Sequence, residues 1–156
     1  MTGSAPVTIR AAEAADARRV FEWRNDPATR AASLSRGEVD WDDHAAWFAR
    51  TLADPDRVLS MAMDGSGLAF AVCRFDREPD GTTEVSINLD PAMRGRGLAA
   101  PALQAAIDDY LRGAGARALT ATIRDGNAAS IRIFERAGFT LTSSVDGVGR
   151  YVRDAG

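Results

Sequence analysis

Two arginines and two glycines stand together at Arg94–Gly97, between a short apolar run and an alanine-rich stretch. Gly95 and Gly97 let the backbone come close to a ligand, and the stretch after them has the spacing of a helix. The first N–H groups of a helix are unpaired and lie at its positive end, where anions bind. Arg94 and Arg96 would add the charge that phosphate prefers. The segment predicts a phosphate-binding turn, with an ordinary strand-to-helix turn bearing solvated arginines as the alternative.

Three phosphate-binding patterns can be compared with this turn. A P-loop needs a lysine, and the chain has none. Gly95, Gly97 and Ala100 have the spacing of a dinucleotide-binding turn, but no acidic residue ends the next predicted strand to hold a ribose. The pattern R-x-x-G-x-[GA] is met by Arg94, Gly97 and Ala99, after a strand that ends in Leu-Asp-Pro and before a long helix. This third pattern is favoured.

Hydrophobic spacing predicts the elements that hold the turn in place. Strands are predicted at 6–12, twice within 58–75 around a turn at 64–67, at 84–90 and at 117–123, with a final hairpin of 139–145 and 150–154. Helices are predicted at 13–26, which Asp26–Pro27 ends, at 35–55 with Asp40 as N-cap, at about 98–111, and at 126–138, which Gly138 closes. The strands at 84–90 and 117–123 flank a helix and should be parallel. We therefore expect a single domain over 1–156, of the α/β class, with a mixed, mostly antiparallel sheet and helices on both faces.

Composition limits the classes of function. The 156 residues carry a formal net charge of −3, and all 19 basic residues are arginine. No basic patch or tail is visible, so a nucleic-acid partner is not expected. Cys73 is the only cysteine, which excludes an internal disulfide and fits a reducing compartment. No segment has the pattern of a signal peptide or a membrane helix, so we expect a cytoplasmic protein with no membrane partner and no metal centre.

Two segments, "EVSINLDPAMRGRGLA" and "ATIRDGNAASIRIFERAGF", follow one another in this order, about thirty residues apart. Together they resemble the motifs of the GNAT superfamily of acyl-CoA-dependent N-acetyltransferases. The resemblance implies a GNAT-type fold whose sheet is splayed at the acetyl-CoA site. It implies that pantetheine pairs with the backbone of Asn88 and Leu89. The pyrophosphate would be held by N–H groups of Arg94, Gly95, Arg96, Gly97, Leu98 and Ala99.

The first third of the chain suggests the acceptor of the acetyl group. "FEWRNDPATRAASLSRGEVDWDDHAAWF" resembles a branch that acts on nucleotide-linked amino sugars, as in pseudaminic-acid synthesis, and related forms occur in ribosomal-protein N-terminal acetyltransferases. Trp23, Arg24, Asn25, His44 and Trp47 are the predicted acceptor-binding residues, with His44 also an alternative base or an ordinary core histidine. A small-molecule amine is expected first and a protein N-terminus second. The alternative from a different class of function is a non-catalytic acyl-CoA-binding module. The sequence does not decide between a monomer and a homodimer.

Acetyl transfer to an amine needs a base, an oxyanion donor and a way for the thiolate to leave. Glu84 lies on the splayed strand, where this family often has its base, and the N–H of Leu89 is the implied oxyanion donor. Many members have a tyrosine seven residues after the asparagine of the second motif. Counting from Asn127 gives Phe134, which cannot donate a proton, so Ser130 is the substitute donor. Asn127, Ser130 and Phe134 are also predicted to contact the cofactor, and Asn127 suits a helix N-cap.

Overall fold

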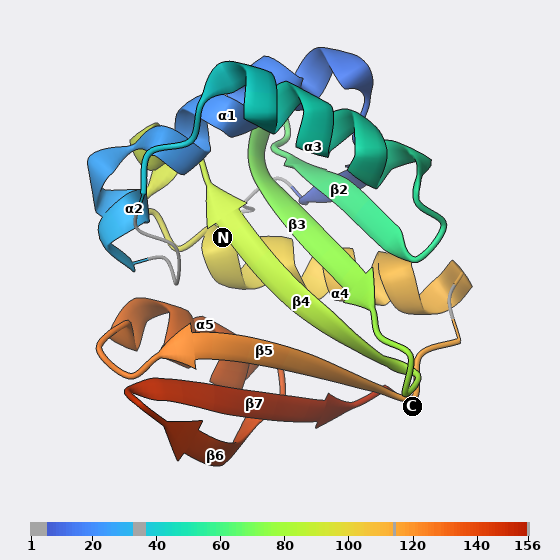
Figure 1. The fold of residues 1–156 in the computed structure, drawn as a ribbon, viewed down its shortest axis with the longest axis vertical. Helices are drawn as coiled ribbons and strands as arrows, with labels where there is room; N and C mark the ends of the chain where they lie inside the picture. Colours follow the sequence, from blue (N-terminus) through green and yellow to red (C-terminus); the bar gives the residue numbers. More distant parts are fainter. Residues whose placement is uncertain (1–5, 33–36, 114, 156) are drawn as a thin grey trace.

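A seven-stranded sheet forms the middle layer of the computed structural model, which describes residues 6–32, 37–113 and 115–155 (Figure 1). In spatial order its strands are β1 (Thr8–Ala11), β2 (Arg57–Met63), β3 (Ala69–Arg77), β4 (Thr82–Leu89), β5 (Ala118–Arg124), β7 (Val148–Asp154) and β6 (Thr140–Val145). The helices are α1 (Ala17–Asn25), α2 (Pro27–Ala32), α3 (Trp41–Ala53), α4 (Ala99–Gly113) and α5 (Ala128–Arg136), with 3-10 turns η1 (Ala14–Asp16) and η2 (Pro91–Met93). Within these residues no helix combines the length and apolarity that crossing a membrane requires.

The strand pairing confirms the predicted mixed sheet. β4 and β5 are parallel and α4 connects them, whereas every other neighbouring pair in the described sheet is antiparallel. The predicted hairpin between β2 and β3 is present, and its turn includes Gly67 at a φ of 84°. The predicted hairpin at the C-terminal end is formed by β6 and β7.

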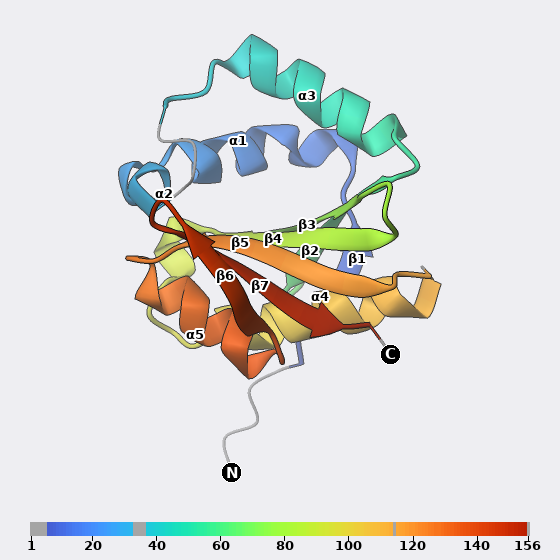
Figure 2. The same ribbon diagram turned by 60° about the horizontal axis from the view of Figure 1, so that its bottom comes forward.

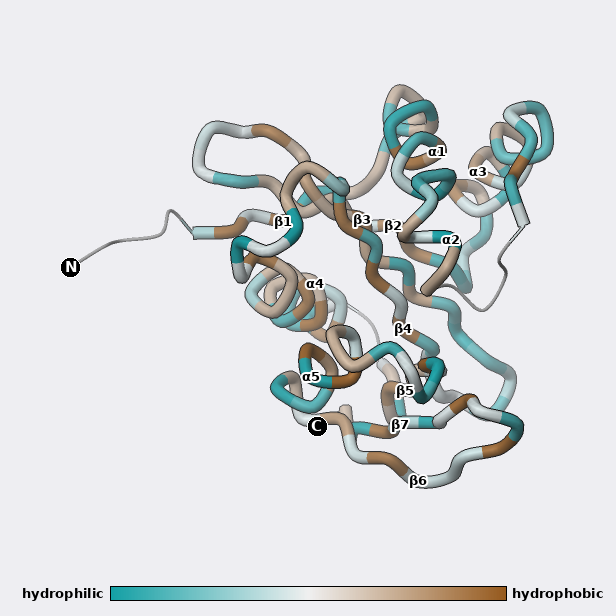
Figure 3. Tube along the Cα trace, turned by 90° about the vertical axis from the view of Figure 1, so that its left-hand side faces the viewer, coloured by the Kyte–Doolittle hydropathy of each residue, from teal (hydrophilic) through white to brown (hydrophobic). Residues whose placement is uncertain are grey.

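Helices cover both faces of the sheet, as predicted. α1 and α3 lie over one face and α4 and α5 over the other (Figure 2). α4 turns its residues at helical spacing toward the sheet, and these are all buried: Ala102, Leu103, Ala106, Ile107 and Tyr110. Hydrophobic residues follow the central strand β3 (Figure 3). Among them Cys73 is fully buried, and burial raises the pKa of its thiol to about 12.

Element ends follow the predicted signals with one exception. Asp40 caps α3, because its side chain accepts hydrogen bonds from the N–H groups of Asp42 and Asp43. The exception is α2, which the sequence interpretation missed by taking Asp26–Pro27 as a stop. The Asp26 carboxylate instead accepts the N–H groups of Ala28 and Thr29 at 3.1 Å each and begins a new helix. Residues 35 and 36, at the start of the second predicted helix, lie outside the described residues.

Candidate active site

A gap opens in the sheet between β4 and β5. The two strands pair only where Thr82–Glu84 runs beside Ala118–Thr120. Beyond that point β4 continues along β3 to Leu89, and β5 continues along β7 to Arg124, so the strands diverge (Figure 1). The sheet is splayed, as the resemblance implied, and part of the β4 backbone loses its neighbour.

The hydrogen-bond pattern of β4 identifies the backbone groups that face the gap. The N–H of Asp90 donates to the carbonyl of Phe70 at 2.8 Å, and that of Glu78 donates to the carbonyl of Thr82 at 2.8 Å. Residues with even numbers in β4 therefore use their backbone groups on β3. Since these groups alternate in direction along a strand, those of Ile87 and Leu89 point into the gap.

This alternation corrects one prediction and supports another. Asn88 lies opposite Val72, and its backbone groups belong to the β3 ladder, so Asn88 does not offer them to a ligand. Ile87 replaces it as a backbone partner for an extended, amide-bearing ligand. Leu89 keeps its predicted place, with an N–H directed into the gap.

The arginine–glycine turn presents a group of free donors beside the gap. Gly95 and Gly97 have φ values of 76° and 71°, which favour glycine because other side chains rarely adopt them. Among the described residues, no acceptor is found for the backbone N–H groups from Gly95 to Ala100. They lie at the positive end of α4, so the turn has the geometry of an anion site. Arg96 is exposed there, whereas Arg94 directs its guanidinium away, to Asp26.

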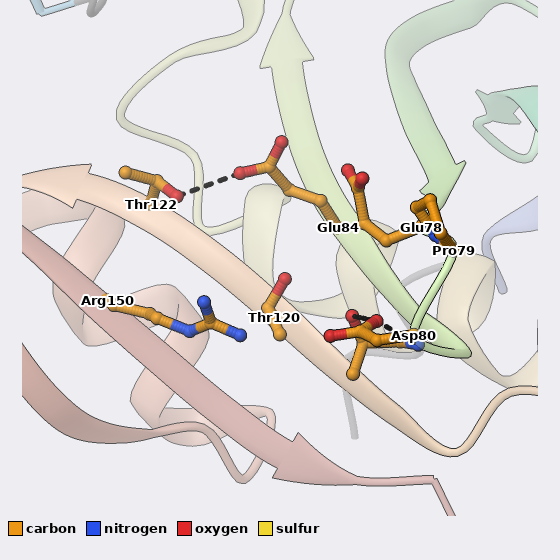
Figure 4. Close-up of a pocket in the computed structure, with 8 residues that line it drawn as sticks. Glu78, Pro79, Asp80, Glu84, Thr120, Thr122 and Arg150 are labelled. Atoms are coloured by element: carbon orange, nitrogen blue, oxygen red, sulfur yellow. Dashed lines mark hydrogen bonds between the residues drawn. The ribbon is translucent and has the colours of Figure 1, made fainter.

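Glu84 lies at the point where β4 and β5 begin to diverge. Its Oε2 accepts a hydrogen bond of 2.8 Å from the hydroxyl of Thr122, while Oε1 has no partner in the described part of the chain (Figure 4). The carboxylate lines a polar cavity of about 360 Å³, together with threonines of β4 and β5, the Glu78–Asp80 turn and Arg150. A fixed carboxylate with one free oxygen, beside a cavity that admits a small polar molecule, can accept a proton.

Arginine residues line the same face of the sheet above β3 and β4. Arg74, on β3, lies 3.0 Å from Asp76 and has its guanidinium 5.7 Å from the centre of the Trp47 ring. Arg24 is half-buried in the last turn of α1, and no acidic or hydrogen-bond partner for it occurs among the described residues. Burial and the positive charge of Arg74 both lower the pKa of Arg24. Arg74 is paired with Asp76, but the charge of Arg24 is unpaired and partly removed from water, so this face of the sheet can hold an anion.

Comparison with known proteins decides the family. Residues 7–140 match the model of the acetyltransferase (GNAT) domain. The chain belongs to the GNAT family. The L-methionine sulfoximine/L-methionine sulfone acetyltransferase of Salmonella typhimurium is 33% identical over 92% of this chain and 85% of its own. The L-amino acid N-acyltransferase MnaT of Escherichia coli is 31% identical over 92% and 85%. The structure of yncA from Salmonella typhimurium with its cofactor acetyl-CoA has a TM-score of 0.76 and 27% identity, covering 96% of this chain and 94% of that one.

The GNAT protein is therefore an N-acetyltransferase that uses acetyl-CoA and a small-molecule amine. This result favours the R-x-x-G-x-[GA] interpretation of the turn over the dinucleotide-binding and non-catalytic alternatives. The free N–H groups of the turn fit a pyrophosphate, and the free backbone groups of Ile87 and Leu89 fit the amides of pantetheine. These relatives do not support the predicted amino-sugar branch.

Two predicted acceptor residues of the GNAT protein belong to its core. His44 is 2% exposed and lies among aromatic rings, with Nε2 3.0 Å from the carbonyl oxygen of Ala17. Burial lowers its pKa first of all, and the nearby charge of Arg24 adds to this. Trp23 is 5% exposed and packs in the same core. Both side chains are buried in the core, which favours a structural role for each; their contact with an acceptor, and His44 as base, stay predictions.

Asn25 and Trp47 have different surroundings. The Asn25 side chain donates to the carbonyl of Val39 at 2.8 Å and accepts its N–H at 2.9 Å. Asn25 therefore binds the segment between α1 and α3, and both polar atoms of its side-chain amide take part in these hydrogen bonds. Trp47 is half-buried beside Arg74, so it lies on the same face of the sheet as the two arginines. Its contact with an acceptor and that of Arg24 and Asn25 stay predictions.

The second GNAT motif forms the start of α5. Asn127 is the N-cap, since its Oδ1 accepts the N–H of Ser130 at 3.2 Å. Phe134 is 3% exposed and packs edge-on against Phe139 with ring centres 5.1 Å apart. It is a core residue with no polar atom, so it does not protonate a thiolate. The roles of Asn127 and Ser130 toward CoA stay predictions.

Proposed function

We propose that this GNAT enzyme acetylates the α-amino group of free L-amino acids or close analogues, of which methionine sulfoximine and methionine sulfone are examples. The observation that carries the proposal is the pair of Arg24 and Arg74 on the same face as Glu84. An α-amino acid has a carboxylate, which needs a cation, and an ammonium, which must lose a proton before it attacks a thioester. The relatives that act on L-amino acids and on methionine sulfoximine support this choice.

The register of the strands makes the arrangement specific. Arg74 lies opposite Ser86, and Asp76 lies opposite Glu84. The anion-binding arginine is thus two residues further along the sheet than the base, about 7 Å at the backbone. The Arg74 side chain extends in the direction of Glu84, because its Nε lies 3.0 Å from Asp76, the residue opposite Glu84. An amino acid whose carboxylate is bound by the arginines would extend its amine toward Glu84 and the gap.

The transfer step then uses groups of this chain in sequence. The free Oε1 of Glu84 accepts a proton from the ammonium, and the amine nitrogen attacks the thioester carbonyl. The N–H of Leu89 stabilises the negative oxygen that develops. The new N–C bond forms, the C–S bond breaks, and the thiolate leaves with the bonding electron pair. The second proton on the attacking nitrogen passes to the thiolate, directly or through solvent, which leaves a neutral amide and CoA thiol. A thiol has a pKa near 8.5, so the thiolate can leave without a strong acid at the position of Phe134.

The experiment compares acceptors that differ by a single group. L-methionine sulfone and its α-amide are offered with acetyl-CoA, beside a nucleotide-linked amino sugar and a short peptide, and CoA release is measured. Loss of hydrogen bonds to a charged group costs about 1.5–3 kcal/mol, so kcat/KM for the amide should fall by about 10- to 150-fold. Equal rates for the acid and the amide would contradict the proposal. Preference for the peptide would indicate an N-terminal acetyltransferase, and preference for the sugar would restore the amino-sugar prediction.

A further inference from the structure

Arg94 belongs to the arginine–glycine turn at 94–97, called the cofactor turn below, but its side chain binds a distant part of the chain. Nη1 lies 3.2 Å from Oδ2 of Asp26, and Nη2 donates a hydrogen bond to the hydroxyl of Thr29. Asp26 follows α1 directly, and Thr29 lies in the first turn of α2. One guanidinium therefore joins the turn that binds CoA to the junction of two helices on the acceptor side.

The junction that Arg94 holds is the one that carries Arg24. Arg24 lies in the last turn of α1, two residues before Asp26, and Asn25 between them clamps Val39. Beside the junction, a hollow of about 720 Å³ separates α1 from the chain at 90–92, just before the cofactor turn. The Arg94 side chain reaches the end of α1 from the far side of this hollow, and it adds to the contacts that Trp23 and Asn25 make there.

We propose that Arg94 is a positioning residue for the acceptor site rather than a phosphate ligand. It holds the end of α1, and with it Arg24, against the turn that binds CoA. To reach a phosphate, its guanidinium would have to leave Asp26 and Thr29, while the turn already offers free N–H groups and the exposed Arg96. Ordering of the turn by CoA should therefore strengthen acceptor binding, and by reciprocity the acceptor should strengthen CoA binding. The nature of the acceptor rests on the proposed function, but the link itself does not.

The test removes each partner of the pair. Arg94→Gln, Asp26→Asn and the double variant are compared with Arg112→Gln, which removes an exposed ion pair of 3.0 Å with Asp109 on α4. CoA affinity is measured by calorimetry, and KM and kcat are measured with L-methionine sulfone. We expect both single variants to raise the acceptor KM by at least fivefold and to change CoA affinity by less than threefold. The double variant should be no worse than Arg94→Gln alone, because that change already removes the ion pair that Asp26→Asn removes. Arg112→Gln should change nothing.

A second readout needs no acceptor. Hydrogen exchange of the amides of residues 23–32 is measured with and without CoA, and CoA should slow it in the wild type but not in Arg94→Gln or Asp26→Asn. A drop of CoA affinity by more than tenfold in Arg94→Gln alone would identify a phosphate ligand and overturn the proposal. An unchanged acceptor KM together with wild-type exchange would also overturn it. If the wild type acetylates none of the acceptors offered, the proposed function fails, and the exchange result alone decides the role of Arg94.

Discussion

The surroundings of the Glu84 carboxylate are formed by two strands, β4, which carries it, and β5, which carries Thr122. The sequence places a carboxylate on the strand before the cofactor turn, and the structure adds a hydroxyl on β5 that binds one of its oxygens. The bond fixes the side chain at the mouth of the gap and leaves the other oxygen free. The pairing of β4 with β5 stops at Glu84, so this carboxylate lies where the gap in the sheet begins.

Replacing this carboxylate should separate proton acceptance from shape. Glu84→Gln keeps the length of the side chain and can still accept the bond from Thr122, but it cannot act as a base. Since general-base catalysis contributes about 10²–10⁴-fold, kcat/KM near neutral pH should fall by about that factor. The loss should shrink as pH rises, because free amine then forms without help. Pre-steady-state and steady-state rates across pH check this, with the exposed Glu22→Gln as control. Near-wild-type activity at every pH would show a structural carboxylate.

Single residues were also where sequence interpretation was least complete. His44 is next to aromatic residues in the sequence, but its burial depends on Phe21 and Ala17 of a different helix. Spacing within α3 does not reveal which helix covers that histidine. Arg74 was missed because it belongs to no motif. The available signal was its alternation with the buried Cys73 and Phe75, which places it on the opposite face of β3.

At the scale of elements, the cofactor turn depends on the strand before it and the helix after it. β4 ends at Leu89, the Asp90 side chain caps η2 by accepting the N–H of Ala92, and α4 begins at Ala99. The two glycines between them take positive φ values, and a Cβ atom on either would meet open space. Backbone conformation, rather than crowding by protein atoms, therefore accounts for glycine here, and the open space beside each glycine leaves room for the predicted phosphate.

Two substitutions at Gly97 should distinguish strain from charge. Asparagine and aspartate have nearly the same size, and both tolerate the φ of 71° better than most residues do. Only aspartate adds a negative charge beside the pyrophosphate. Gly97→Asp should weaken CoA binding by well over tenfold, or more than about 1.4 kcal/mol, and Gly97→Asn should weaken it several-fold less. Calorimetry on variants with wild-type circular dichroism measures both. Equal affinities of the two variants would refute a charge effect at this position.

Elements were largely predictable because their signals are local. Periodicity, caps and the β-α-β unit gave the strands and helices and the one parallel pair. The choice between Asn88 and Ile87 was not predictable in the same way. It depends on which neighbouring strand uses the even-numbered backbone groups of β4, and hence on the pairing with β3. α2 escaped prediction because a proline ends one helix and also suits the first position of the next.

At the scale of the whole molecule, the sheet has two parts that share a short seam. The part formed by β1 to β4 meets the part formed by β5 to β7 only where Thr82–Glu84 pairs with Ala118–Thr120. The buried cluster under α4 and α5 contains residues of both parts, among them Phe75, Val85, Leu119 and Ile123. The gap can therefore exist without dividing the molecule, because the helices and their core hold its two sides.

A charged pair stabilises β1, the strand at the edge of the sheet. Arg10 on β1 binds Asp16 with two hydrogen bonds, of 2.7 and 2.9 Å, and Asp16 also accepts the N–H of Glu13. The bond from Arg10 is the main cause of a pKa of Asp16 below its usual value. This contribution to stability is complete above the pKa of the unfolded chain and disappears as pH falls through the lower, folded-state pKa.

Removing this carboxylate should therefore matter at neutral pH and not in acid. Asp16→Asn should lower the free energy of unfolding by about 1.5–3 kcal/mol at pH 7. The difference from the wild type should shrink below about pH 4, where the unfolded chain begins to take up the proton. Urea unfolding at several pH values measures it, with Asp109→Asn as a surface control. A difference that stays constant down to about pH 2 would mean that the charge of Asp16 is not the cause.

The burial of Cys73 has a practical consequence. A thiolate is the form that attacks disulfide reagents, and a fully buried thiol with a pKa of about 12 is both unexposed and protonated at neutral pH. The folded enzyme therefore has no thiol that reacts with such a reagent, since Cys73 is its only cysteine. A chromogenic disulfide reagent present during turnover would report the sulfur released from acetyl-CoA against a background close to zero. The same reagent would become a probe of unfolding once the β-sheet opened and Cys73 reached water.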